Sequence, residues 1–289
     1  MLLPVTGLFV LLLWSYFRGG AAPDETLREV TRTTLRLAAP AQPAPARSTR
    51  QVLEAEALPR VTPRRDAKPA NHRGDIVLII DDLGFDGQPV DRVMALDRNI
   101  NAAILPNGNR AREFANRFSS RGFEVLCHLP MEPLGHASPG ANAILTSMSD
   151  EQITRLTREN LRAVPQARGV NNHMGSRATA DRRVMKSVLS SLPDGMYFID
   201  SKTSGGSIAG TMAREMNIRS GSRSVFLDDV QSDAAVRRQV AQLATAAEKH
   251  GLAIGIGHPY AVTMRVLAAE MPSLRDRGFR FVRASSAVR

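Results

Sequence analysis

Carboxylate and imidazole side chains, the groups that bind metal ions and move protons, recur directly after short apolar runs. Asp81 and Asp82 follow the run at residues 76–80, and His128 follows the run at 123–127. The other polar residues in equivalent places are Asn171, Asn172, His173, Asp200, Ser201, Asp228, Asp229 and His258. One carboxylate with two imidazoles is the ligand set of a catalytic zinc site that keeps an open position. A further carboxylate and imidazole would suit general acid–base work.

Taken singly, each of these residues also has an ordinary structural interpretation. The Asp81-Asp82 pair would cap the segment that follows it, and Asp228-Asp229 resembles a turn. A single histidine at a strand end is more often a hydrogen-bonding residue than a ligand. The metal interpretation depends on a fold that brings these ends together, where like charges would repel unless a cation or proton lies between them.

The elements that must position these residues follow a repeating strand–helix pattern from Asp75 onward. The expected strands cover residues 76–80, 101–105, 123–127, 169–171, 196–199, 225–227, 252–256 and 279–282. The expected helices cover residues 90–96, 111–121, 149–164, 181–192, 208–216, 233–250 and 264–277. Such alternation predicts an α/β fold with parallel strands and right-handed crossovers. We expect a (β/α) barrel of seven or eight strands, either regular or distorted. The alternative is an open doubly wound sheet. In such barrels the chemistry lies at the C-terminal ends of the strands.

Several short motifs resemble those of the divergent polysaccharide deacetylase family. They cover residues 79–84, 121–133, 169–176, 198–201 and 256–259, and the resemblance extends over residues 75–282. It implies that Asp81 is a general base, Asp82 a metal ligand and His258 a general acid.

The resemblance also implies a ligand set of Asp82, His128 and His173, with Glu132 as a weaker candidate. Ordinary members of the wider polysaccharide deacetylase group carry two histidines four residues apart in the second motif. Here His128 and Glu132 occupy those places. The arginine-containing third motif of those members is absent, and Asn172-His173 stands in about that place.

The function implied is metal-dependent hydrolysis of N-acetyl or related acyl groups on an envelope polysaccharide, with zinc as the expected divalent metal. In this scheme Asp200 orients an imidazole, while Asn171 and Asn172 donate hydrogen bonds to a developing oxyanion or to sugar hydroxyls. The alternative is a non-catalytic, metal-containing envelope protein that binds glycan or a protein partner. The altered second and third motifs favour this alternative, as does an aromatic content of only 5%.

Composition and the first part of the chain set the remaining expectations. The formal net charge is +10, but no motif resembles a nucleic-acid-binding module. The single cysteine, Cys127, excludes an intramolecular disulfide, and a buried structural role is favoured over a nucleophilic one.

Residues 1–22 predict a signal peptide or an N-terminal membrane anchor, with an apolar run at 1–17. Residues 23–74, rich in Pro, Ala and Arg, predict a disordered linker, and residues 75–289 the barrel domain. We therefore expect the protein to be exported to the periplasm or cell envelope, either free or anchored to the inner membrane.

Overall fold

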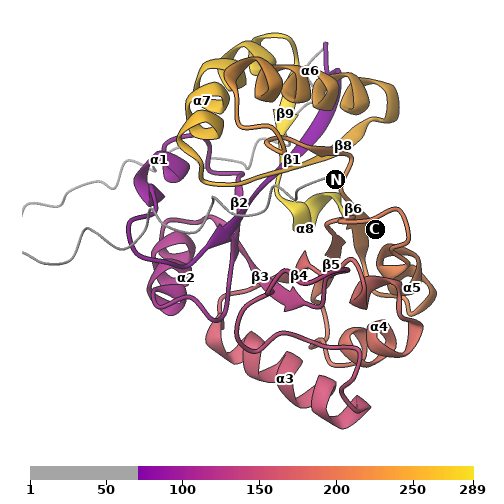
Figure 1. The fold of residues 1–289 in the computed structure, drawn as a ribbon. Helices are drawn as coiled ribbons and strands as arrows, with labels where there is room; N and C mark the ends of the chain where they lie inside the picture. The colour runs from indigo at the N-terminus through magenta and orange to yellow at the C-terminus, as the bar shows by residue number, and fades with distance from the viewer. Residues whose placement is uncertain (1–70) are drawn as a thin grey trace, which may run out of the picture. The chain divides into compact units, whose positions relative to one another are not determined.

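A computed structural model describes residues 71–289, a sheet of parallel strands surrounded by helices (Figure 1). The predicted leader and nearly all of the predicted linker lie outside these residues. The strands are β1 (Gly74–Leu83), β2 (Asn101–Ile104), β3 (Glu124–Met131), β4 (Gly169–Met174), β5 (Tyr197–Asp200), β6 (Ser220–Ser222), β7 (Val225–Phe226), β8 (Leu252–Gly257) and β9 (Phe279–Phe281). The helices are α1 (Val90–Met94), α2 (Ala111–Ser120), α3 (Asp150–Ala163), α4 (Arg182–Leu189), α5 (Ala209–Glu215), α6 (Asp233–His250), α7 (Ala261–Asp276) and α8 (Ala284–Ala287), with a 3-10 turn at Ala178–Ala180.

The strand order confirms the barrel type of sheet. Neighbouring strands follow the order β6-β5-β4-β3-β2-β1-β8-β7, and β9 pairs with the first residues of β1. Strands β1 to β6 are neighbours in chain order, and β8 and β7 continue the sheet on the other side of β1, whereas a doubly wound sheet reverses its order at a switch point. Among the described residues β6 and β7, the two ends of the path, do not pair with each other, so the sheet curls as an incomplete barrel. Of the strands, only β6 was not predicted, because its sequence Ser-Gly-Ser lacks β-branched or aromatic residues.

Two apolar clusters lie on the two faces of the sheet. Alternate residues of each strand, such as Ile76 and Leu78 of β1, pack against the surrounding helices. The residues between them, such as Val77 and Ile79, form a smaller cluster in the barrel interior. Both faces of the central strands β1, β2 and β3 are therefore buried, which is why the sequence shows continuous rather than alternating apolar runs there.

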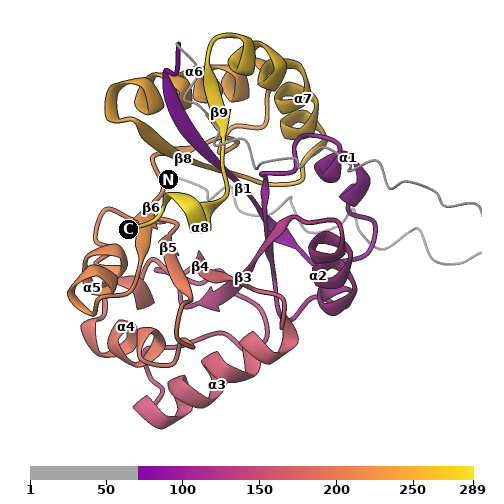
Figure 2. The same ribbon diagram turned by 180° about the vertical axis from the view of Figure 1, so that it is seen from behind.

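The C-terminal segment covers the end of the sheet where β2 and β3 begin (Figure 2). The backbone N–H of Ala284 donates to Asn101 Oδ1, and that of Ser285 donates to Glu124 Oε1. Tyr197 also donates its hydroxyl to Glu124, at 2.6 Å. This end is polar and closed, so the opposite end, where the strands finish, is the one available for a site. Within residues 71–289, no helix is long and apolar enough to cross a membrane.

Candidate metal centre

Strand periodicity directs the predicted site residues into the barrel interior. Side chains alternate between the two faces of a strand, so residues two apart point the same way. In β1 the interior residues Val77 and Ile79 are followed by Asp81, and in β3 the interior residue Leu126 is followed by His128. The same alternation carries Asn171, His173, Ser201 and His258 to the interior side. Cys127 points to the other face and packs in the outer apolar cluster.

Asp82 does not follow this alternation, and its backbone explains why. The pairing of β1 with β2 shifts register between Ile80 and Leu83, an irregularity of the β-bulge kind. Asp82 lies within it and has a φ of 58°, in the left-handed region that non-glycine residues rarely adopt. A bulge of this kind re-aims a side chain, and such backbone strain is concentrated at functional sites. Both aspartates of the pair therefore reach the same end of the barrel interior.

Asp82, His128 and His173 converge on one point. Asp82 Oδ1 lies 2.8 Å from His173 Nδ1 and 3.1 Å from His128 Nε2, and the two nitrogens are 3.3 Å apart. Although Oδ1 is buried, it has no hydrogen-bond partner of acceptable geometry among the described residues. Donor atoms that each lie about 2.0–2.1 Å from one zinc ion are roughly 3 Å from one another. The three residues thus fit a divalent ion, and a fourth position would remain for another ligand.

A buried amide links His128 to Asp81. His128 Nδ1 donates to Asn171 Oδ1 at 3.0 Å, and Asn171 Nδ2 donates to Asp81 Oδ1 at 2.8 Å. With its proton on Nδ1, the imidazole presents the lone pair of Nε2 to the cluster, as a metal ligand must. Asp81 Oδ2 lies 3.5 Å from the same Nε2.

Burial and neighbouring charges move the pKa values of the two aspartates in opposite directions. Burial raises the pKa of Asp81, and the nearby imidazoles of His128 and His258 only partly oppose it. Burial also acts to raise the pKa of Asp82, but the contacts with His128 and His173 outweigh it and hold that pKa well below its usual range. Asp82 is therefore the better anionic ligand, and Asp81 the better proton acceptor.

His258 faces the cluster from the end of β8 and is fixed by Asp228. Its Nδ1 lies 2.9 Å from Asp228 Oδ1, while its backbone N–H donates to Asp228 Oδ2 at 2.6 Å. Its Nε2 lies 3.6 Å from Asp82 Oδ2. Burial lowers the pKa of His258, but the hydrogen bond and charge of Asp228, with the charges of Asp81 and Asp82, raise it to about 9. Phe226 packs edge-on against the ring, and Tyr260 stacks on it.

Asp228 is a site residue that the sequence interpretation missed, because it was taken for part of a turn. Its position after a short apolar strand, like that of Asp81, was the available signal. Asp200, which was expected to orient an imidazole, does something else. Its carboxylate accepts hydrogen bonds from Lys202 N–H, Ser207 Oγ and Gly210 N–H, so it holds the start of α5.

Glu132 does not join the ligand cluster. Its Oε2 accepts hydrogen bonds from Thr146 N–H and Thr146 Oγ1, both at 2.6 Å, and its Oε1 pairs with Arg177 at 3.3 Å. The side chain is therefore engaged in holding the long connection between β3 and α3. The four-residue spacing from His128 placed it on the same strand end, but β3 ends at Met131 and the chain turns away.

The two asparagines, expected to contact substrate, both form hydrogen bonds within the protein. Asn171 is fully buried, and both ends of its amide are bonded. Asn172 accepts from Ser201 N–H at 2.9 Å and donates to Met174 O at 2.7 Å. Both amides therefore position the strand ends, and Asn172 also lines the pocket beside Asp81 and His258, so its contact with substrate stays a prediction.

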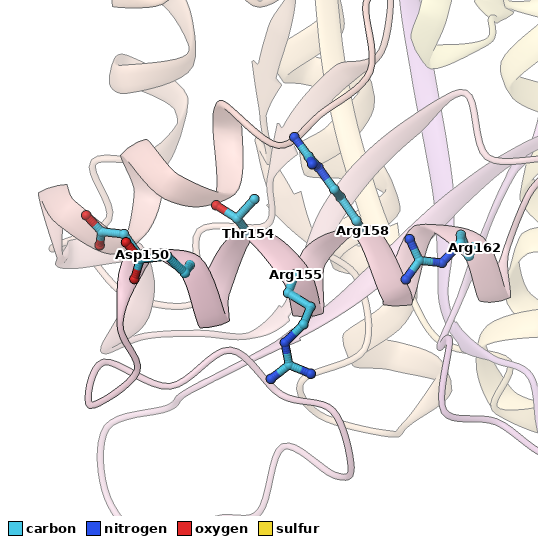
Figure 3. A pocket seen from close by; sticks show the side chains of 6 residues that line it. Asp150, Thr154, Arg155, Arg158 and Arg162 are labelled. Atoms are coloured by element: carbon cyan, nitrogen blue, oxygen red, sulfur yellow. The ribbon is translucent and has the colours of Figure 1, made fainter.

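A pocket of about 620 Å³ lies beside Asp81 and His258 and provides room for a substrate. Another groove, of about 460 Å³, lies on the outer face of α3 and holds none of the predicted site residues (Figure 3). Its arginines include Arg155 and Arg162, both paired with Glu159. This groove has the mixed charge of a solvated helix face.

Comparison with known proteins gives both a family and a fold. The sequence profile described as divergent polysaccharide deacetylase matches residues 78–288. The chain is 38% identical over 195 residues to the uncharacterized protein YibQ of Escherichia coli, a match that covers 67% of this chain and 61% of that relative. It is 36% identical over 202 residues to an uncharacterized protein of Haemophilus influenzae, covering 70% of this chain and 72% of the relative.

Among solved structures, an uncharacterized protein from Agrobacterium tumefaciens superposes with a TM-score of 0.72 at 21% identity, covering 77% of this chain and 93% of that one. At this identity the likeness shows the fold alone. The family assignment rests instead on the profile match, which runs from within β1 to beyond β9, and on the relatives, which are more than a third identical over the aligned residues. The chain belongs to the divergent polysaccharide deacetylase family.

Proposed function

We propose that the protein is a metal-dependent hydrolase that removes N-acetyl or related acyl groups from an envelope polysaccharide. Family membership supports a polysaccharide deacetylase-like role. The observation that carries the finer proposal is the Asp82–His128–His173 cluster, which lies between a proton acceptor, Asp81, and a proton donor, His258. A ligand cluster flanked by an acid and a base is what hydrolysis of an amide requires.

Asp81 serves as the base in this proposal. A divalent ion such as zinc, when held by Asp82, His128 and His173, supplies a Lewis acid for the acyl carbonyl and for water. Asp81 accepts a proton from the attacking water, because its Oδ2 lies next to the ligand atoms while its Oδ1 is held by Asn171. Its raised pKa makes the carboxylate a stronger base than an exposed one.

His258 serves as the acid. With Nδ1 engaged by Asp228, the imidazolium presents its Nε2 proton toward the cluster. As the C–N bond breaks, this proton passes to the departing amine nitrogen. A pKa raised to about 9 keeps the imidazole protonated at neutral pH, as the donor role requires. Asp228 acts through His258, as a positioning residue.

A test of the metal site is to measure metal content in the purified protein and in two variants. We expect about one zinc-like ion per chain, and a strong loss of affinity in His128→Ala and in His173→Ala, because each removes one of three ligands. His250→Ala, at the exposed end of α6, is the matched control and should bind as wild type. Unchanged affinity in both site variants would refute the ligand set.

Activity on N-acetylated oligosaccharides then separates the two functional hypotheses. Release of acetate that depends on His128 and His173 supports the hydrolase. A wild-type protein that binds metal and glycan but releases no acetate would support the non-catalytic alternative.

We also propose that the protein is exported to the periplasm or envelope, on the basis of the apolar run at residues 1–17. Residues 1–30 fused to a reporter that is active only outside the cytoplasm should give an active reporter. An inactive fusion, with the reporter expressed in the cytoplasm, would contradict export.

A further inference from the structure

The pocket beside the metal centre lies at the seam of the incomplete barrel. Only Arg223 and Ser224 connect β6 to β7, and both line the pocket. Its other polar lining residues include Ser201, Thr203, Gln239 and Gln242, which suit the hydroxyl groups of a sugar. Asp81 and His258 line it too, so a molecule in the pocket would lie directly against the proposed acid and base.

Arg223 is held in place on one edge of its guanidinium group. Nε donates to Ser201 O at 2.6 Å, and Nη2 donates to Lys202 O at 2.5 Å. The guanidinium carbon also lies 4.9 Å from the centre of the Phe226 ring. A guanidinium has five N–H donors, so three remain, including the pair shared between Nη1 and Nη2. That pair matches the two coplanar oxygens of a carboxylate.

No acidic side chain among the described residues forms an ion pair with Arg223. Burial lowers its pKa, and the charges of Asp81, Asp200 and Asp229 offset this only in part, from beyond ion-pair distance. Asp81 and Asp200 are already hydrogen bonded elsewhere, and Asp229 lies at the exposed edge of the pocket. A half-buried, immobilised cation without an acid partner is costly unless a ligand supplies one.

We propose that Arg223 forms a carboxylate-binding subsite, and that the substrate is an acidic glycan with a carboxylate close to its N-acyl group. The proposal rests on the proposed function for the identity of the ligand as an N-acylated glycan. The planar fork of Arg223 sets both the charge and the orientation of the group bound. A substrate held at this subsite and by its hydroxyl groups places the acyl group toward Asp81 and His258, across the same pocket.

The test compares two oligosaccharides that differ only in charge. One is a tetrasaccharide of alternating N-acetylglucosamine and glucuronate, and the other is the same compound with its carboxylates reduced to alcohols. Calorimetry gives the dissociation constant of each for the full-length protein, and a parallel assay follows release of acetate. We expect wild type to prefer the acidic compound by about 10- to 100-fold, the range for hydrogen bonds to a charged group.

The variant that tests the subsite is Arg223→Gln, which should bind both compounds with nearly equal affinity. Its control is Arg219→Gln, because Arg219 also donates to two carbonyl oxygens, of Ser285 and Gly195, but does not line the pocket. The control should keep the preference of wild type. Metal content and melting temperature check that both variants are folded.

The outcomes separate the subsite from the reaction. Equal binding of the two compounds by wild type, no binding of either, or equal weakening of both by Arg223→Gln would overturn the subsite. In the last case Arg223 would only stabilise the connection between β6 and β7, or the negative charge of Asp81. Preferential binding without acetate release would uphold the subsite and count against the hydrolase. Release of acetate from both compounds with equal efficiency would uphold the hydrolase and overturn the subsite.

Discussion

Asp81 and Asp82 are adjacent in sequence, yet their environments divide the work between them. Asp81 continues the interior alternation of β1 and is almost fully buried, whereas Asp82 is turned inward by the bulge and meets two imidazoles. Their pKa values move in opposite directions for these reasons. Two carboxylates with different environments can act as base and ligand in one site.

The Asp81→Asn variant tests this division directly. We expect turnover to fall by about 10²–10⁴-fold, the usual contribution of a general base, with metal content unchanged. The amide keeps the shape of the carboxylate and loses its basicity, while Asp82 remains to bind the ion. The variant Asp194→Asn, in an exposed turn, is the control for loss of one carboxylate. An Asp81→Asn protein that loses its metal would show that the two roles are reversed.

At this scale the sequence predicted which residues meet better than what each of them contacts. The family resemblance implied Asp82, His128 and His173 as a ligand set, and the structure brings these three residues together. The partners of Asn171 and Asp200 could not be predicted, because a hydrogen bond depends on atomic positions set by the folded chain. The pairing of Asp228 with His258 joins residues thirty positions apart.

At the scale of elements, the irregular features decide where the polar side chains point. In a regular β1 the side chain of Asp82 would point toward the helices. The shift in register turns it toward the barrel interior instead. Glu132 is one of the residues that hold the connection from β3 to α3. Its backbone N–H donates to Ile144 O, and its carboxylate binds Thr146 and Arg177.

Changing Glu132 to Gln tests whether it is structural. The change weakens three polar contacts of a partly exposed side chain, so the free energy of unfolding should fall by roughly 1 kcal/mol. Metal affinity should stay as in wild type, because Glu132 is absent from the ligand cluster. Denaturant unfolding and metal titration measure the two effects. Loss of metal with unchanged stability would show that Glu132 is a ligand after all. The control is Glu159→Gln, on the exposed side of α3.

Apolar periodicity predicted most of the elements but not these details. Buried strands such as residues 76–80 are visible as continuous runs of Ile, Val and Leu, and α3 has its capping box at Ser149, where the predicted helix begins. A bulge carries no apolar signature, and β6 is short and polar because it lies at an end of the strand path. The short helix α8 was not predicted either, because its sequence Ala-Ser-Ser-Ala has no helical periodicity.

At the scale of the whole molecule, the barrel separates a closed end from a functional end. Asn101 and Glu124 bind the C-terminal segment where β2 and β3 begin, while the candidate metal ligands lie toward the ends of β1, β3 and β4. The repeated strand–helix pattern predicted this polarity, because all parallel strands of a barrel end on the same side. The sequence also placed the start of the barrel domain at Asp75, one residue after β1 begins.

The last prediction concerns where the folded domain starts. β9 pairs with β1 at Gly74, Asp75 and Ile76, and the N–H of Arg73 donates to Gly278 O. A chain that begins at residue 71 keeps these bonds, so we expect it to fold and bind metal with the melting temperature of the full-length protein. A chain that begins at residue 75 loses the contacts of Arg73 and Gly74 and should melt at a lower temperature, with β9 less protected from hydrogen exchange. Thermal unfolding and hydrogen exchange compare the three proteins.

If the chain from residue 71 proves unfolded or protease-sensitive, then residues before it contribute to the domain, and the boundary lies earlier than the change in composition suggests.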